Sequence, residues 1–131
     1  MISLLLLCLA SLGAATRCYG IDGEWENELG SHMTLKTVGD QFRGTYVSAV
    51  GAVNGTYSLD GKFETACENP TLAFSVIWNN ANLTTRSVTA WTGVLINDVI
   101  YATWLLTVSV NTTSSVWGAT RVGTNRFSRV K

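Results

Sequence analysis

Two stretches decide how this chain folds: Gly23-Glu-Trp-Glu-Asn-Glu-Leu-Gly-Ser31 and Phe42-Arg-Gly-Thr-Tyr-Val-Ser-Ala-Val50. In the first stretch, glutamates alternate with apolar or amide side chains, and a β-strand sends alternate side chains to opposite faces. The three glutamates are expected to face water, so Trp25, Asn27 and Leu29 are expected to face the interior. The alternation therefore predicts a half-buried strand with an amide on its inner face.

The second stretch places further polar groups inside. If Phe42 faces inward, the same parity carries the inward set through Tyr46 and Ser48 to Val50. Removing such polar groups from water without partners costs roughly 1 to 3 kcal/mol each. Asn27, Tyr46 and Ser48 must therefore either satisfy one another or receive a ligand.

The chain beyond its first residues consists of short β-favouring runs separated by turn residues, with no helical period, which is typical of an all-β sandwich or barrel. Asn97-Asp98 is the kind of dipeptide that makes a two-residue hairpin turn. Consecutive hairpins favour an eight-stranded antiparallel up-and-down β-barrel, able to hold one small ligand. The expected strands are at about 23–29, 32–38, 41–50, 55–59, 71–78, 85–96, 99–107 and 119–130, with a turn at Asp60-Gly61 and a Ser/Thr/Asn-rich loop at 109–115.

Composition limits the class of protein. A chain of 131 residues with 47% hydrophobic residues has room for one domain with one core. Nine basic and nine acidic residues cancel, and no basic cluster interrupts the chain, so neither nucleic acid nor an acidic membrane surface is an expected partner. The single histidine, His32, argues against a metal site, which usually needs three or four ligands. No cofactor is expected.

The first segment, Met1–Ala15, has the features of a secretory signal peptide. The run Leu4–Leu7 belongs to an apolar segment too short to cross a bilayer, and small residues follow it. Cleavage after Ala15 leaves one domain of residues 16–131, and cleavage after Gly20 would also remove Cys18. The protein is therefore expected to be secreted and to have no contact with a membrane.

Secretion gives meaning to the cysteines and to the sequons. In an oxidising compartment Cys18, if it is retained, can pair with Cys67 in a disulfide. Asn-X-Thr sequons predict N-linked glycosylation at Asn54, Asn82 and Asn111.

Collected by parity, the inward side chains at one end of the barrel form a polar cluster walled by indoles. Its members are Asn27, Tyr46, Ser48, Ser87, Thr89 and Asn125, together with Trp78, Trp91 and Trp104. Aromatic walls with a few convergent hydrogen-bonding groups are the usual form of a small-molecule site. Because these groups are neutral, a fitting ligand has a neutral polar head, such as an amide or a urea, and an apolar body. The alternative is a satisfied polar network among ordinary core tryptophans.

Catalysis has little support in the sequence. His32 stands beside a turn, outside the inward set, so no nucleophile has a histidine base. The acids of the strand at 23–29 alternate outward, and no paired carboxylates remain for acid and base roles. No Gly-rich phosphate loop follows a strand. These absences favour a binding protein over an enzyme.

In combination and order, the motifs of this chain resemble those of the avidins and streptavidins, a family of secreted biotin-binding proteins. The resemblance covers nearly the whole mature chain. It rests on residues 23–31 and on Gly44-Thr-Tyr-Val-Ser-Ala-Val50, Trp91-Thr-Gly93, Trp104-Leu-Leu106 and Trp117-Gly-Ala-Thr-Arg-Val-Gly123.

The resemblance implies a biotin site built from the matching residues. Asn27, Ser31 and Tyr46 look like the trio that donates hydrogen bonds to the ureido oxygen of biotin. Ser48 and Asn125 would accept hydrogen bonds from the two ureido nitrogens. The other implied contacts are Thr89 near the thioether sulfur, Ser87 at the valerate carboxylate, Trp78, Trp91 and Trp104 around the ring, and Leu29, Val50 and Leu106 beside them. Trp117 matches a tryptophan that each subunit inserts into a neighbour's site, which implies a homo-oligomer, usually a tetramer.

The chain departs from the family pattern at several of these positions. Asn125 is the amide of the egg-white type, whereas the bacterial protein has Asp, and Ala52 stands where the bacterial protein has an Asn that contacts the carboxylate. Trp91 follows the bacterial pattern, where the egg-white type has Phe. Leu95 replaces a cysteine of the egg-white protein, so any disulfide must use Cys67.

The sequence-based expectation is thus high-affinity, non-covalent sequestration of biotin, with two alternatives. A non-binding avidin-like structural module of an extracellular matrix would have gaps in the polar set, and here nearly every position is filled. A lipocalin-like carrier of another small hydrophobe would need a less polar interior.

Overall fold

The computed structural model describes residues 20–51, 55–65, 67–79, 84 and 86–131. The expectations for the signal peptide and for Cys18, Ala52, Asn54 and Asn82 lie outside the described residues.

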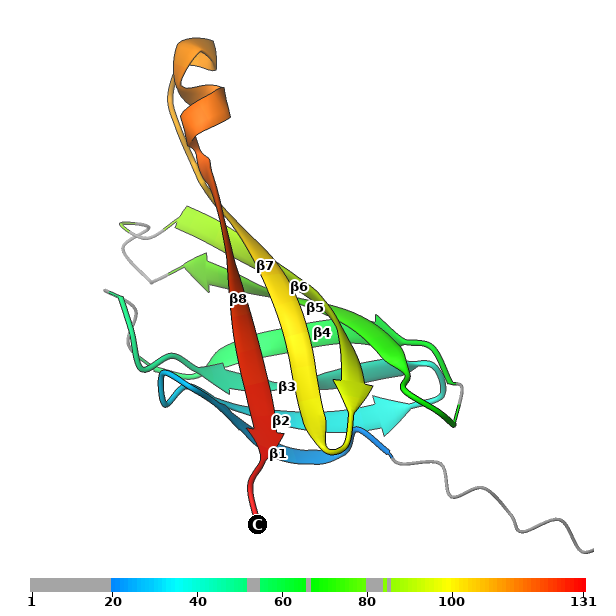
Figure 1. Cartoon of the computed structure of the whole chain (residues 1–131). Coiled ribbons are helices and arrows are strands. Elements are labelled where there is room, and N and C mark those ends of the chain that lie inside the picture. The colour runs from blue at the N-terminus through cyan, green and yellow to red at the C-terminus, as the bar shows by residue number, and fades with distance from the viewer. Residues whose placement is uncertain (1–19, 52–54, 66, 80–83, 85) are drawn as a thin grey trace, which may run out of the picture.

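The described chain forms one closed antiparallel barrel, as the sequence predicts (Figure 1). Neighbours in sequence are neighbours in the sheet, and the last strand pairs with the first, so the topology is up-and-down. The strands are β1 (Gly23–Asn27), β2 (His32–Val38), β3 (Gln41–Val47), β4 (Tyr57–Phe63), β5 (Thr71–Asn79), β6 (Arg86–Ile96), β7 (Val99–Val108) and β8 (Thr120–Arg129).

Alternation of side chains builds the core inside this barrel. In β5, for example, Leu72, Phe74, Val76 and Trp78 are buried, and the residues between them are exposed. The rings of Phe74 and Trp91, which lie opposite each other in β5 and β6, stack with centroids 4.9 Å apart. Burial of these apolar and aromatic side chains is the main stabilising term of such a fold.

The turn predicted at Asn97-Asp98 is confirmed, and the turn predicted at Asp60-Gly61 is wrong. Asn97 and Asp98 both have positive φ, 49° and 62°, as a tight hairpin turn requires. In contrast, Asp60 and Gly61 lie within β4. Gly61 is needed there because a Cβ at this position would lie 2.4 Å from the ring of Phe42.

Two predicted strands end earlier than their alternation suggested. β1 ends at Asn27 and not at Leu29, because the backbone turns there: the Gly30 N–H donates to the Asn27 carbonyl at 3.0 Å. Gly30 has φ 85°, a conformation that favours glycine. β3 ends at Val47 and not at Val50, so strand parity does not determine where Ser48 and Val50 point.

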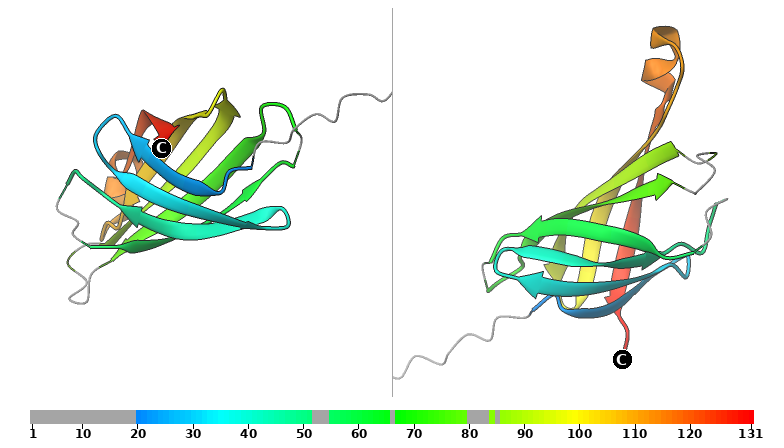
Figure 2. Two further views of the ribbon diagram at one scale, coloured as in Figure 1. Left: turned by 90° about the horizontal axis from the view of Figure 1, so that it is seen from below. Right: turned by 180° about the vertical axis from the view of Figure 1, so that it is seen from behind.

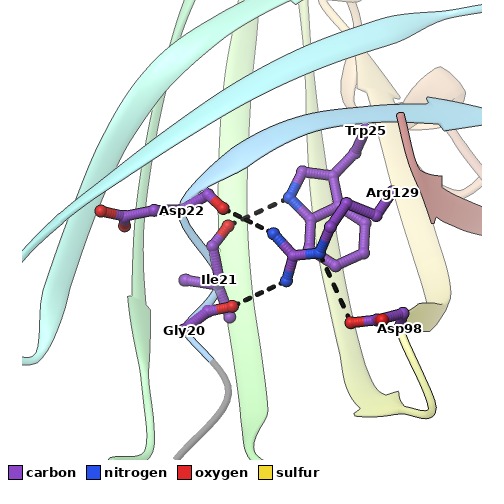
Figure 3. Close-up of polar contacts among 6 residues, drawn as sticks. All are labelled: Gly20, Ile21, Asp22, Trp25, Asp98 and Arg129. Carbon is purple, nitrogen blue, oxygen red and sulfur yellow. Dashed lines mark hydrogen bonds and ion pairs between the residues drawn. The ribbon is translucent and has the colours of Figure 1, made fainter. Parts of the chain in front are cut away.

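At one end of the barrel, Arg129, the last residue of β8, contacts several segments of the chain (Figure 3). Its guanidinium donates to the backbone carbonyls of Asp22 and Gly20 at 2.6 and 2.7 Å and contacts the Asp98 carboxylate at 3.4 Å. The guanidinium carbon also lies 4.3 Å from the ring centroid of the fully buried Trp25. The arginine therefore joins the start of β1, the end of β8 and the β6–β7 turn.

The opposite end carries the β1–β2, β3–β4, β5–β6 and β7–β8 connections and is called the open end below. The β7–β8 hairpin projects beyond the rest of the barrel there (Figures 1 and 2). Its tip, predicted as a Ser/Thr/Asn-rich loop, includes a short 3₁₀ helix, η1 (Thr113–Gly118), and the side chain of Trp117 in η1 is 94% exposed. Over the described residues, the structure contains no helix with the length and apolar character needed to span a membrane.

Candidate functional site

The predicted polar residues gather at the open end, and Asn27 is the best ordered of them by hydrogen bonds. Its side-chain oxygen accepts from the backbone N–H groups of Leu29 at 3.0 Å and Ser31 at 2.9 Å. These two hydrogen bonds hold the oxygen toward the turn, so the amide nitrogen faces the interior. There it donates to the Tyr46 hydroxyl at 3.4 Å. The β1–β2 turn thus fixes a neutral donor inside the barrel.

Ser31 and Tyr46 complete a group of three donors. The Ser31 side chain is 1% exposed, and its oxygen accepts from the backbone N–H of Ala49 at 2.9 Å, so its hydroxyl group acts as a donor inside the barrel, where it bonds to Tyr46. Burial raises the pKa of Tyr46 to about 12, although hydrogen bonds to Ser31 and Asn27 act in the opposite direction. The phenol therefore keeps its proton at physiological pH and can donate it.

Asn125 supplies an acceptor from the other side of the barrel. The indole N–H of Trp91 donates to its side-chain oxygen at 3.0 Å. Its amide nitrogen donates to a carboxylate oxygen of Glu28 at 2.9 Å. A carbonyl oxygen has two lone pairs, so the Asn125 oxygen can accept one more hydrogen bond.

Aromatic rings wall this group of polar atoms. Tyr46 stacks on Trp91 with ring centroids 5.2 Å apart and meets Trp78 edge-on at 5.5 Å. Trp78 is itself oriented by its indole N–H, which donates to the buried hydroxyl of Thr89 at 2.8 Å. Each indole of this wall is therefore held by a hydrogen bond as well as by packing.

Three further predicted residues are half-buried and lie nearer the open end: Trp104, Ser87 and Leu106. Trp104 lies opposite Trp91 on β6 and opposite Gly123 on β8. A Cβ at Gly123 would lie 2.2 Å from the Trp104 ring, so this glycine makes the space that the indole occupies. Ser87 pairs with Trp78 in the β5–β6 ladder, and Leu106 lies opposite Thr89.

Four predicted residues are not brought into this buried group. Leu29 and Val50 are 53% and 47% exposed, because β1 and β3 end before them, so neither is buried as strand parity suggested. Ser48 is half-buried; its hydroxyl donates to the Val50 carbonyl at 2.8 Å and accepts from the Val50 N–H at 3.3 Å, so its oxygen can accept one more hydrogen bond. Trp117 is almost fully exposed, in η1 of the β7–β8 hairpin that projects beyond the barrel (Figure 2).

Glu28 is the site residue that sequence reasoning missed. Strand alternation placed it in water with Glu24 and Glu26, and Glu28 is indeed exposed, but β1 ends one residue before it and its carboxylate accepts hydrogen bonds from β8. The second oxygen of its carboxylate accepts from the Arg126 N–H at 2.8 Å, so Glu28 links the β1–β2 turn to β8. The only signal in the sequence is its position, directly before the Leu29-Gly30 turn.

The polar network is complete without a ligand. Over the residues that the structure describes, no buried side-chain nitrogen or oxygen lacks a hydrogen-bond partner. The buried polar side chains are the neutral Asn27, Ser31, Thr89 and Asn125. Within the same part of the chain, no three His, Cys, Asp or Glu side chains are grouped as a metal site would require. A neutral polar ligand would therefore exchange hydrogen bonds with groups already held in place.

Comparison with known proteins gives a consistent result. The family model described as the Avidin family matches residues 15–130. Avidin from Gallus gallus is 36% identical over 98% of this chain and 90% of its own length, and avidin-related protein 4/5 from Gallus gallus is 38% identical over 97% and 92%.

Solved structures agree with these sequence relatives. The crystal structure of Xenavidin superposes with a TM-score of 0.77 at 31% identity and covers 87% of this chain and 100% of its own. An X-ray structure of a biotin binding protein from chicken also has a TM-score of 0.77, at 36% identity, and covers 88% of this chain and 100% of its own.

Proposed function

The chain belongs to the avidin family, and on that premise we propose that it binds biotin non-covalently, with high affinity, at the open end of the barrel. The observation that carries the proposal is a cluster of three neutral groups that can donate hydrogen bonds: Asn27 and Ser31 both contact the Tyr46 hydroxyl, and the Tyr46 ring packs on the indoles of Trp78 and Trp91. A cyclic urea has one oxygen that accepts several hydrogen bonds and two N–H groups that donate. The ureido ring of biotin fits that pattern.

Each remaining role follows the chemistry of the group concerned. The free acceptor capacity of Ser48 and Asn125 suits the two ureido N–H groups. Thr89, already bonded to Trp78, would lie at the thioether sulfur, and Ser87 near the mouth would meet the carboxylate. The apolar contacts proposed for the rest of the ligand are Trp104, Leu106, Leu29 and Val50, and Ala52 is proposed to lie at the ligand carboxylate.

The prearranged network explains why affinity would be high. Polar side chains that are already fixed by hydrogen bonds lose little freedom on binding. Hydrogen bonds inside an aromatic, low-dielectric enclosure are also stronger than in water. Binding, and not catalysis, is the proposed role, because the buried polar side chains of the described interior are all neutral amides and hydroxyls, with Tyr46 protonated.

The test is titration of the purified protein with biotin, together with the variant Tyr46→Phe. Loss of one donor to the ureido oxygen should weaken binding by about tenfold to a hundredfold. Tyr101→Phe is the matched control. Tyr101 is 44% exposed on β7, so this substitution removes the same hydroxyl oxygen from a side chain outside the barrel. A wild-type protein that takes up no biotin would rule out the proposal, and if it still assembled, the structural-module alternative would be preferred.

We also propose that the protein is a homo-oligomer, in the form of a tetramer, in which a neighbouring subunit completes each ligand site. Trp117, at 94% exposure on a projecting hairpin, would cover the open end of a neighbouring subunit. Apolar side chains on the outer face of β5 to β8 supply a surface for assembly: Ile77 and Val88 lie side by side there, as do Leu105 and Val122. Native mass spectrometry measures the number of subunits.

Secretion after removal of the Met1–Ala15 leader, with cleavage no later than Gly20, is proposed on the same family basis. Cys67 is disulfide-bonded in the structure, which supports the proposed bridge to Cys18. Asn111 is exposed beside η1 and accessible for a glycan, as proposed also for Asn54 and Asn82. Peptide mapping of the secreted protein under non-reducing conditions reads the new N-terminus, the bridge and the glycans together.

A further inference from the structure

Glu28 reaches from the β1–β2 turn to β8 and holds two donors there. One carboxylate oxygen accepts from the Asn125 side-chain nitrogen at 2.9 Å, and the other accepts from the Arg126 backbone N–H at 2.8 Å. Both are hydrogen bonds to a charged acceptor, which are shorter and stronger than those between neutral groups. The Glu28 carboxylate therefore bonds to the nitrogen of the Asn125 amide, and the oxygen of that amide is the proposed ligand contact.

The arrangement leaves Asn125 one orientation. Its oxygen receives the indole N–H of Trp91, and its nitrogen faces Glu28. Rotating the amide by a half turn would place its NH₂ group against the Trp91 N–H and its oxygen against the carboxylate. Both new contacts would be repulsive, because each would join two donors or two acceptors. The oxygen is therefore kept facing the interior.

We propose that Glu28 is a positioning residue of the ligand site: its carboxylate fixes the Asn125 amide so that the amide oxygen accepts from a ligand N–H. This inference rests on the proposed function. The negative charge also polarises the amide, which strengthens the oxygen as an acceptor through the chain Glu28, Asn125 and ligand. A neutral asparagine in contact with the ligand thereby gains part of the acceptor strength of a carboxylate.

The surroundings of Glu28 keep it ionised. Partial burial by itself raises the pKa of Glu28, but the hydrogen bonds from Asn125 and from the Arg126 backbone, with the Arg126 charge, together lower it further, so the pKa lies below the ordinary value. The other titratable group that interacts with it is Tyr46, which is neutral at physiological pH. Because the pKa is lowered in the folded protein, the orienting charge is present at neutral pH and is lost only as the pH falls through that lowered pKa.

The first test is biotin dissociation from Glu28→Gln. A glutamine has one acceptor oxygen for two donors, so one of the two hydrogen bonds is lost, as is the charge. Dissociation should be about tenfold faster than in the wild type. Glu26→Gln is the matched control, because Glu26 lies two residues away on the outer face of β1, where its carboxylate lies 3.6 Å from the exposed His32. Equal rates for Glu28→Gln and the wild type would overturn the proposal.

A double-mutant cycle separates positioning from simple support of the turn. In an Asn125→Ala background, Glu28→Gln should no longer change the dissociation rate, because the amide through which Glu28 acts is gone. An effect of unchanged size in that background would show that Glu28 acts by another route, and the proposal would fall.

A third measurement uses the ligand-free wild-type protein and does not depend on biotin binding. The NMR signals of the Asn125 side-chain NH₂ group and the Trp91 indole N–H should titrate together at a pH below the ordinary pKa of a glutamate, and this titration should be absent in Glu28→Gln. If the wild type failed to bind biotin but showed this titration, the proposed function would fall while the Glu28–Asn125 coupling stood. Signals that did not titrate would overturn the coupling itself.

Discussion

At the scale of single residues, neutral side chains perform the hydrogen bonding at the open end. The amide of Asn27 and the hydroxyls of Ser31 and Tyr46 act as donors without carrying charge into the interior, which would be costly to desolvate. Strand parity in the sequence identified Asn27 and Tyr46, and their burial at 6% and 3% exposure agrees with it. Parity did not predict the exposure of Leu29 and Val50, because it applies only as far as the strand continues.

Gly123 tests how tightly the site is packed. A methyl group at this position would lie 2.2 Å from the Trp104 ring, so Gly123→Ala must displace the indole. We expect the protein to be less stable by about 1 to 3 kcal/mol, as for other overpacked interiors, and biotin to dissociate faster. Thermal unfolding and dissociation kinetics measure the two effects.

Gly118→Ala is the control for this substitution, since an added Cβ there meets nothing within 4 Å. Its unfolding temperature should stay at the wild-type value. If Gly123→Ala matched the wild type in both measurements, Trp104 would not be confined as the structure indicates.

At the scale of elements, the tip of the β7–β8 hairpin is not packed against the rest of its own chain. η1 buries none of its residues, and it exposes Val116 and Trp117. A nearly fully exposed tryptophan at the tip of a projecting hairpin is unusual in a monomer and typical of an interface anchor. The sequence indicated this role only through the family resemblance, because periodicity carries no signal in a six-residue 3₁₀ helix.

Trp117→Lys should therefore weaken both assembly and ligand binding. Removing an aromatic anchor and adding a charge at a buried contact should accelerate biotin dissociation by at least about tenfold and shift the subunit distribution in native mass spectrometry to smaller species. Ser114→Lys places the same charge on the same helix and is the control. Unchanged assembly and unchanged dissociation in Trp117→Lys would remove the shared-site proposal.

At the scale of the whole molecule, closing the barrel depends on a short seam. The β1–β8 ladder runs only from the pair Trp25–Arg129 to the pair Asn27–Phe127. Arg129 reinforces it at one end through two backbone carbonyls, the Asp98 carboxylate and the Trp25 ring (Figure 3). At the other end, Glu28 bonds to β8 through Asn125 and Arg126. One end of this seam therefore lies at the proposed ligand site.

Arg129→Gln should open this seam more easily. Several hydrogen bonds of a largely buried guanidinium are lost together with its ring contact, so stability should fall by about 1 to 3 kcal/mol. Arg43→Gln is the control, because the Arg43–Asp60 pair is exposed and should contribute less than about 1 kcal/mol. Thermal unfolding at one fixed protein concentration compares them, since assembly would make the midpoint depend on concentration. Equal losses in the two variants would show that Arg129 is no more than a surface charge.

The sequence by itself determined the eight strands, their consecutive order, the Asn97-Asp98 turn and most of the inward polar set. These depend on local rules, namely alternation of side chains and turn chemistry, which short segments obey on their own. Only the tertiary structure decided that Asp60-Gly61 continues a strand, where Gly61 fits against the Phe42 ring, and that the exposed Glu28 accepts a hydrogen bond from Asn125. Those outcomes depend on contacts between residues far apart in the chain, and no local pattern contains them.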